Sequence, residues 1–380
     1  MSSVSGVEKS DFIPIGSGAS ELIELKVGNS VNRVYTPPPN QFQRAPQTAT
    51  INVNYNPASC ENEMMADVTP WPSNAQAAFS FATNIWGSLI TSSVPIEVDA
   101  CWRELGIGVL GSARALNGFT DGQVVYPVAL ANAIEGVDLD LGTSDIQANF
   151  SSEFSWYLGT DGNTPSSQLD FVSVVLHEVG HGLGFAGSME VGTLTQGGPL
   201  VGRWGFGFGI PSSYDAFVEN GSNQSIINTA IFPNPSEALF QQVTSGNLFF
   251  DGPFSRAANG NAPVALYAPA QWSQGSSFSH LAESFNGTSS ALMTFSLDSG
   301  EARHSPGPVG LALLNDVGWG SIESVVPTPS PTNTPVATTP PNTPTPVTPV
   351  STATPSPEVT SVPIQLTEFW YLPLTFRSSR

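Results

Sequence analysis

The chain has 380 residues, of which 40% are hydrophobic, so it is long enough for one large globular domain or two ordinary ones. It carries 31 acidic against 11 basic residues, for a net charge of −20 and an isoelectric point near 4.3, which disfavours nucleic acid as a partner because like charges repel. No run of about 18 apolar residues occurs, so no transmembrane helix is expected. The polar but weakly charged composition is typical of a secreted or cell-surface protein.

The first part of the chain alternates predicted strands and helices. Residues 1–47, rich in Pro, Ser and Asn, are interpreted as an N-terminal extension or the remnant of a pro-segment. Alternating apolar residues predict strands over residues 48–55, 94–102 and 145–150. Helical spacing of apolar residues predicts a helix over 73–90, with Ser73 as its candidate N-cap. A second long helix follows, so this order predicts an α+β fold with a twisted mixed sheet against two long helices.

The last part of the chain changes composition abruptly. Between residues 325 and 363, proline occurs at about every second or third position among Thr and Ser, which predicts a disordered, extended linker. A short aromatic tail occupies residues 364–380. We therefore expect the folded domain to span 48–324, and a stalk of this kind could associate the protein with a cell surface.

Cys60 and Cys101 are the only cysteines. In an exported chain they are expected to form one structural disulfide. The alternative is that the Cys60 thiolate binds and blocks a catalytic metal to keep an enzyme latent.

The second long helix carries the main chemical signal. A capping-box pattern at residues 167–170 predicts that this helix begins near Ser167. His177 and His181 are four residues apart, so on a helix both imidazoles lie on one face and can bind one ion. Glu178 is offset from that face, where it can accept a proton from a metal-bound water as a general base.

A catalytic zinc needs a third protein ligand and one open position for water. The chain contains two further histidines, His280 and His304, and Asp215 and Glu219 are additional candidates. His304 could instead line the cleft, although a solvated loop histidine is the simpler expectation.

The segment from His177 to Phe185 resembles the HExxHxxG signature of metzincin metallopeptidases. Gly187 stands where the compact form of that signature has its third histidine. Leishmanolysin-like metzincins show the same departure, with a long insertion, an isolated histidine and then a methionine turn. His280 and Met293, thirteen residues apart, match the last two of these elements, and residues 307–319 resemble the C-terminal helical subdomain of the group.

The resemblance implies one catalytic Zn²⁺ held by His177, His181 and His280, with Glu178 as the general base and Met293 packed beneath the metal. It also implies that the strand at 145–150 is the edge of the cleft and pairs with an extended protein or peptide substrate. We therefore expect a secreted, monomeric zinc endopeptidase.

Two other functions stay open. The chain could be a non-catalytic zinc-containing binding or adhesion module on a stalk, or a gluzincin with a downstream Glu as third ligand. Asp138, Asp140, Asp145 and Asp161 could hold structural Ca²⁺, but carboxylates at such uneven spacing are usually solvated.

Overall fold

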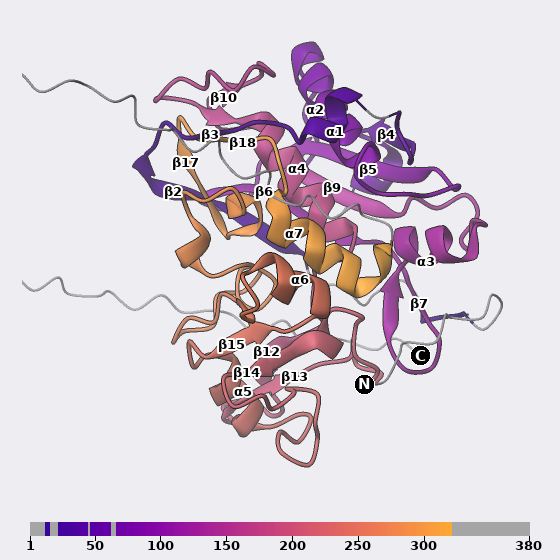
Figure 1. Cartoon of the computed structure of the whole chain (residues 1–380), viewed down its shortest axis with the longest axis vertical. Coiled ribbons are helices and arrows are strands. Elements are labelled where there is room, and N and C mark those ends of the chain that lie inside the picture. Colours follow the sequence, from indigo (N-terminus) through magenta and orange to yellow (C-terminus); the bar gives the residue numbers. More distant parts are fainter. Residues whose placement is uncertain (1–11, 16–21, 45, 62–65, 321–380) are drawn as a thin grey trace, which may run out of the picture. The chain divides into compact units, whose positions relative to one another are not determined.

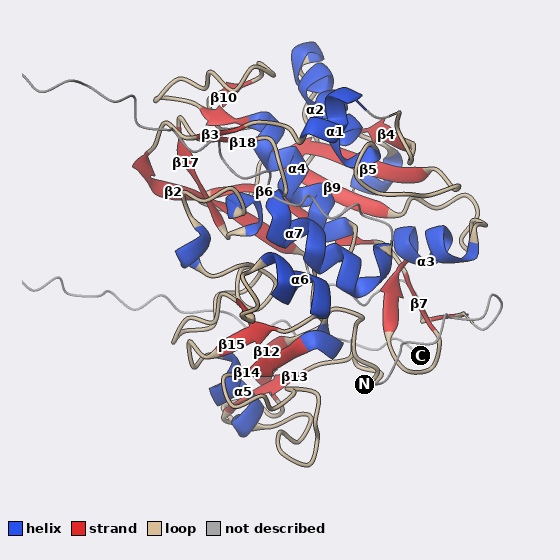
Figure 2. Cartoon of the chain, viewed as in Figure 1, coloured by secondary structure: helices blue, strands red, loops and turns tan. Residues whose placement is uncertain are grey.

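The computed structural model describes residues 12–15, 22–44, 46–61 and 66–320. The chain divides into two units, Met1–Val326 and Pro327–Arg380. The predicted linker at 325–363 and the tail at 364–380 lie outside the described residues, so both stay predictions. Within the first unit, helices and strands form an α+β fold, as expected (Figures 1 and 2).

A six-stranded mixed sheet with the order β17-β2-β6-β9-β5-β4 lies at the centre of this unit. Its strands are β2 (Ile23–Val31), β4 (Ile51–Tyr55), β5 (Ile96–Arg103), β6 (Val109–Ala115), β9 (Ile146–Ser151) and β17 (Ser296–Ser299). β6 is antiparallel to both of its neighbours, β2 and β9, and the other pairs in this sheet are parallel. β6 therefore runs against the direction of every other strand in the sheet.

Two long helices, α2 (Ser73–Gly87) and α4 (Phe171–Gly182), pack against each other, and the indole nitrogen of Trp86 donates to the carbonyl of Leu176 at 2.9 Å. Every residue of α4 is buried, as expected for a helix that is apolar on most of its faces. Gly182 allows α4 to approach the sheet, because a Cβ at this position would lie 2.4 Å from Ile146 of β9. The predicted pair of helices is thus present, and each helix contacts both the other helix and the sheet.

α2 begins at Ser73, as predicted, but the N-cap of α2 and the start of α4 differ from those that the patterns indicated. Pro72, not Ser73, is the N-cap of α2, since Ser73 is already helical and makes no capping bond. α4 begins at Phe171 rather than near Ser167, because residues 169–170 form an extended pair with residues 156–157. Asp170 is its N-cap and accepts a hydrogen bond from the Ser173 amide at 2.8 Å.

The strand predicted at 145–150 is present as β9, but the expectation that it forms the edge of the cleft and pairs with a substrate is wrong. β9 lies between β5 and β6 and is paired along both sides. Its backbone therefore has no free edge for a substrate. The sequence analysis missed β6 and β2, which continue the sheet on that side; Gly111 and Ser112 interrupt the apolar alternation in β6.

Shorter elements complete the described part of the chain. The remaining helical segments are α1 (Asn40–Arg44), η1 (Ala58–Cys60), α3 (Val128–Glu135), η2 (Asp215–Phe217), α5 (Glu237–Val243), α6 (Pro253–Ala258), η3 (Glu283–Phe285), η4 (Ala291–Met293), α7 (Gly307–Leu314) and η5 (Asn315–Trp319). The remaining strands are β1 (Ile13–Pro14), β3 (Tyr35–Thr36), β7 (Gly118–Thr120), β8 (Val125–Pro127), β10 (Trp156–Tyr157), β11 (Leu169–Asp170), β12 (Glu190–Thr193), β13 (Leu200–Arg203), β14 (Val218–Asn220), β15 (Leu248–Phe250), β16 (Val264–Ala265) and β18 (Ala302–Arg303). None of the described helices is long and apolar enough to cross a membrane.

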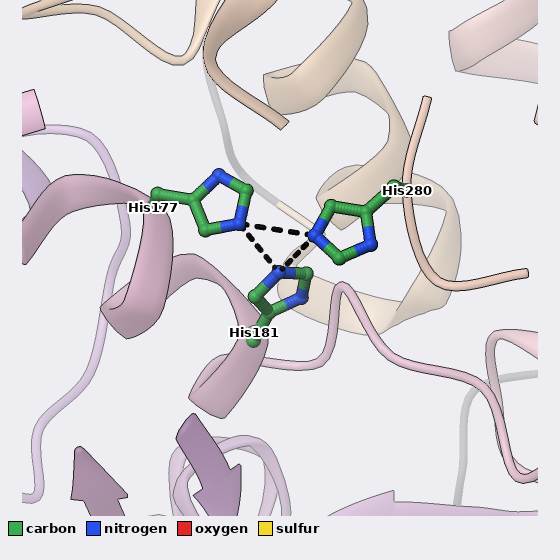
Figure 3. Close-up of side chains that lie close together, drawn as sticks. All are labelled: His177, His181 and His280. Carbon is green, nitrogen blue, oxygen red and sulfur yellow. Dashed lines mark hydrogen bonds between the residues drawn. The ribbon is translucent and has the colours of Figure 1, made fainter. Parts of the chain in front are cut away.

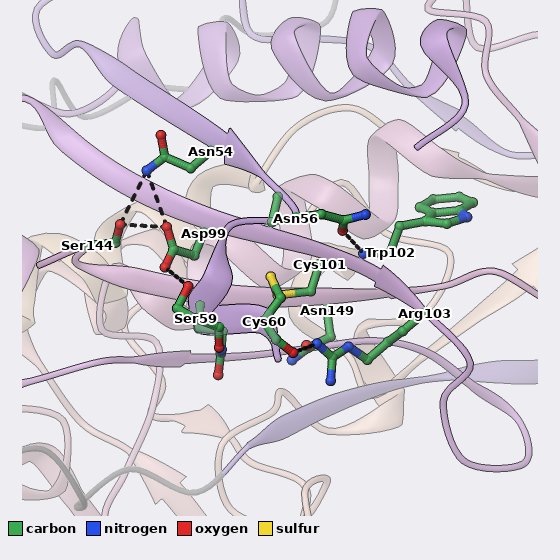
Figure 4. Close-up of a disulfide and its surroundings, with 12 residues drawn as sticks. Asn54, Asn56, Ser59, Cys60, Asp99, Cys101, Trp102, Arg103, Ser144 and Asn149 are labelled. Carbon is green, nitrogen blue, oxygen red and sulfur yellow. Dashed lines mark hydrogen bonds between the residues drawn. A yellow bond between two sulfur atoms is a disulfide. The ribbon is translucent and has the colours of Figure 1, made fainter. Parts of the chain in front are cut away.

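Cys60 and Cys101 form the predicted disulfide, which joins η1 to β5 (Figure 4). Both cysteines are fully buried. Nearby, Asp99 of β5 accepts hydrogen bonds from Asn54, Ser59 and Ser144, and the Arg103 guanidinium donates to the Cys60 carbonyl. With its sulfur in this bond, Cys60 offers no thiolate, so the structure does not support the alternative of a metal-blocking cysteine.

Replacing both cysteines by serine should destabilise the domain. The bridge closes a loop between residues 41 positions apart, and a crosslink of that span reduces the entropy of the unfolded chain. We expect the free energy of unfolding to fall by about 2–4 kcal/mol. Urea denaturation of the double variant beside the parent chain measures this loss, and equal midpoints would contradict a stabilising role.

Candidate metal centre

Three histidines from two distant segments meet beside α4 (Figure 3). His177 and His181 project from successive turns of the helix, and His280 comes from a loop about a hundred residues further along the chain. The Nε2 atoms of His177 and His181 are 2.9 Å apart, and the Nε2 of His280 lies 3.1 Å and 3.2 Å from them. The structure thus brings together the three histidines that the sequence analysis proposed as ligands.

The other ring nitrogen of each histidine has a backbone partner. Each Nδ1 lies 2.7 Å from a carbonyl oxygen, that of Leu292 for His177, Phe185 for His181 and Ser276 for His280. A carbonyl oxygen only accepts, so each Nδ1 carries the proton and the Nε2 of a neutral ring presents a lone pair. Three lone pairs directed at one point repel one another unless a cation lies between them.

Burial keeps the three rings neutral. Loss of hydration lowers the pKa of His177 and of His280 well below the usual range, and neighbouring histidines lower both further. Burial likewise lowers the pKa of His181 to about 4. At neutral pH all three Nε2 atoms are therefore free to coordinate a metal.

The donor set fits zinc. Three neutral imidazoles are a ligand set of catalytic zinc sites, in which the fourth position is left for water. Two nitrogens that bind one tetrahedral zinc at about 2.0–2.1 Å lie about 3.3 Å apart. The observed separations of 2.9–3.2 Å need only a small adjustment to reach this value.

The side chain of Glu178, the proposed base, extends from α4 to β6. Its side chain is fully buried, and a Cβ at Gly111 of β6 would lie 2.7 Å from its Oε1, so only glycine leaves room for it there. Neither carboxylate oxygen has a hydrogen-bond partner among the described residues. Burial raises the pKa of this carboxyl well above its ordinary value, and the nearby backbone amide of Leu25 only partly opposes the rise. An unpaired buried carboxyl of this kind is costly and typical of functional sites.

Met293 lies against the same helix. It is buried, and a Cβ at Gly180 would lie 3.1 Å from its Sδ. The carbonyl of the preceding Leu292 orients His177, and the amide of Leu281 donates to the Met293 carbonyl at 2.9 Å. The turn that contains Met293 therefore supports both His177 and the segment that carries His280.

A buried ion pair that no sequence pattern predicted stabilises this turn. Arg303 forms a 2.8 Å salt bridge with Glu301 and donates to the carbonyl of Ala291 and to the hydroxyl of Thr294. The charged residues of this segment gave no sign of burial, because charged side chains are usually solvated.

The expectation of a solvated loop at His304 is wrong. His304 is fully buried, and its Nε2 lies 2.9 Å from Oδ1 of Asp170, the N-cap of α4. It packs at the beginning of the helix, whereas the other three histidines meet near its end. His304 is buried because the carboxylate of Asp170, which caps the helix, is itself buried and therefore needs hydrogen-bond donors.

The other candidate ligands lie outside the triad. Asp215 accepts hydrogen bonds from the Ser188 and Ser212 amides, and Glu219 is part of β14. Among the described residues, the three histidines are the one group of three or more potential ligands close enough to share an ion, so the carboxylates considered for Ca²⁺ do not form such a group.

Asp145 is buried, and its pKa is raised to about 7, mainly by loss of hydration.

A pocket opens beside His181. Its lining includes Ile15 and Ile23 from the N-terminal segment, Arg114 of β6 and Ser213. The lining is mainly apolar, which suits an aliphatic side chain. No local sequence pattern indicates this pocket, because its residues come from separate stretches of chain between residues 15 and 213.

Comparison with known proteins gives little further information. Residues 119–203 match a family model described as SPBPB7E8-like. That range includes His177, Glu178 and His181 but not His280 or Met293. No curated protein and no solved structure matches the chain.

Loss of a residue that hydrogen-bonds to a metal ligand typically lowers metal affinity roughly 10–100-fold. His280 is proposed as a ligand itself, so replacing it by alanine should lower zinc affinity by more than this. His304→Ala is the matched control, because His304 is an equally buried histidine outside the triad. Metal content after dialysis should fall well below one zinc per chain in His280→Ala and stay near one in the control. A full zinc in His280→Ala would assign the third ligand elsewhere.

Proposed function

We propose that the protein is a secreted or cell-surface zinc endopeptidase of the metzincin type, most similar to the leishmanolysin-like group. In support, α4 carries the HExxH motif, the third histidine follows a long insertion, and Met293 lies against the motif helix. A mixed sheet flanked by two long helices agrees with the same fold.

One observation carries the proposal. Three Nε2 lone pairs converge on one point, and the residue after the first of these histidines is a buried carboxyl without a hydrogen-bond partner among the described residues. A structural metal site has no use for a buried acid beside it, whereas hydrolysis needs a group that accepts a proton.

Zinc in this site would supply a Lewis acid that polarises a peptide carbonyl and would lower the pKa of a bound water to about 7. Glu178 orients the water and accepts its proton as it attacks the carbonyl. The carboxyl then donates that proton to the leaving amine. Beside a divalent cation the pKa of Glu178 would fall, which restores the ionised form that a base requires.

The partner we propose is a protein or peptide substrate in an extended conformation. Nucleic acid is disfavoured by the net charge of −20. We also propose that the protein acts as a monomer.

The alternative is a zinc-containing binding module without turnover, which keeps the three ligands but needs no base. Hydrolysis of casein that is abolished by a chelator and restored by zinc would favour the peptidase, and zinc binding without hydrolysis would favour the module.

Glu178→Gln should retain one zinc per chain. Its rate of hydrolysis of labelled casein should fall by at least about 10²–10⁴-fold, because the amide cannot accept a proton. Glu190→Gln is the matched control, since Glu190 lies in β12, paired with Arg203. Both variants and the parent are compared with and without chelator over long incubations. Parental activity in Glu178→Gln would refute the assigned base.

A further inference from the structure

The candidate site is closed. His177, Glu178 and His280 are fully buried, and His181 is 1% exposed. A peptide substrate must reach both the metal and the carboxyl, so a peptidase with this arrangement needs some part of the chain to move away.

The strand β2 lies over the carboxyl. Leu25 of β2 stands opposite Gly111 of β6, which is the residue that Glu178 contacts. Leu25 is 1% exposed, so it is buried in this contact. β2 is therefore the layer that covers the base.

The same strand bridges the two sides of the site. On one side β2 pairs antiparallel with β6, and on the other it pairs parallel with β17. The Lys26 amide donates to the carbonyl of Phe295 at 2.9 Å, two residues after Met293. The Glu24 amide donates to the carbonyl of Gly275 at 2.8 Å, next to Ser276, which orients His280.

Removing β2 would leave a slot one strand wide between β6 and β17, with unpaired backbone groups on both sides. Such a slot accepts an extended peptide by strand addition. Ile23 of β2 also lines the pocket beside His181, so its departure would widen that pocket.

We infer that β2 occupies the substrate position of this enzyme as an intramolecular inhibitor, and that its release opens a groove for extended peptides with aliphatic side chains. This inference rests on the proposed peptidase function. It assigns the role of the covering strand to residues 23–31 of the predicted N-terminal extension.

The attachment of β2 permits release. The two cysteines are at positions 60 and 101, so no disulfide holds residues 1–33. Within β2 only Ile23 and Leu25 are buried, and its last three residues, 29–31, are exposed. Arg33 is exposed in the loop that follows, where a single cut would separate β2 from the rest of the chain.

The test uses the full chain with a site for a specific endoprotease inserted between Arg33 and Val34. A scrambled insertion is the matched control. After cutting, we expect residues 1–33 to separate during gel filtration and casein hydrolysis by the zinc-loaded protein to rise by at least tenfold. A synthetic peptide of residues 23–31 should inhibit the cut form, and the same peptide with serine for Ile23 and Leu25 should not.

A second measurement does not depend on activity. Diethylpyrocarbonate modifies accessible imidazoles, and all four histidines of the chain are buried. In metal-free protein, cutting should expose the three histidines of the triad to modification and leave His304 protected, as read by peptide mass spectrometry. Equal modification of the triad before and after cutting would overturn the inference.

Two outcomes separate this inference from the proposed function. If the triad becomes reactive and the zinc-loaded cut form hydrolyses nothing, β2 covers the site but the peptidase proposal fails. If the uncut chain hydrolyses casein as fast as the cut chain, and Glu178→Gln abolishes both activities, the peptidase stands and the inhibitory strand is refuted.

A substitution covers the case in which the cut fragment stays bound. Leu25→Asp places a charge in the buried contact, whereas Val31→Asp, at a position that is 66% exposed, is the matched control. In the cut chain, Leu25→Asp should release the fragment and Val31→Asp should not alter its binding. A fragment that stays bound in cut Leu25→Asp, with the triad unreactive, would refute release.

Discussion

Three imidazole nitrogens that face one another with lone pairs repel unless a cation lies between them, and the surrounding structure holds them in this arrangement. The Nδ1 of each ring lies 2.7 Å from a backbone carbonyl oxygen, and the three carbonyls belong to different segments of the chain. The turn at Met293, braced by Arg303, supplies one of these carbonyls and packs against α4. The site thus depends on backbone positions around the helix as much as on the three ligands.

The antiparallel strand β6 contacts both the helix that carries Glu178 and the neighbouring strand β2. β6 runs against its neighbours and passes Glu178 at Gly111, where any larger residue would meet the carboxyl. β2 is the next strand of the sheet after β6, and its other neighbour is β17. The elements that would bind an extended substrate are therefore the same elements that hold the N-terminal segment.

Local features were the best predicted. The spacing of His177 and His181 implied one helical face, and α4 has both residues on successive turns. The disulfide followed from the expectation that a chain with two cysteines is exported, and the disulfide itself is present. Predictions failed where distant segments compete for a position: β9 is central because β6 and β2 extend the sheet, and His304 is buried because Asp170 needs a partner. Neither effect appears in a local pattern.

The sequence by itself determined the helix that carries His177 and His181 and the three strands and the other long helix that follow a regular apolar period, because each of these depends on residues close together in the chain. Composition alone fixed the acidic net charge. Only the tertiary structure decided that His280 reaches the pair while His304 contacts Asp170, the N-cap at the other end of the helix. It alone decided that β2 covers Glu178, since strand pairing depends on hydrogen bonds between residues some 85 positions apart, such as Leu25 and Gly111.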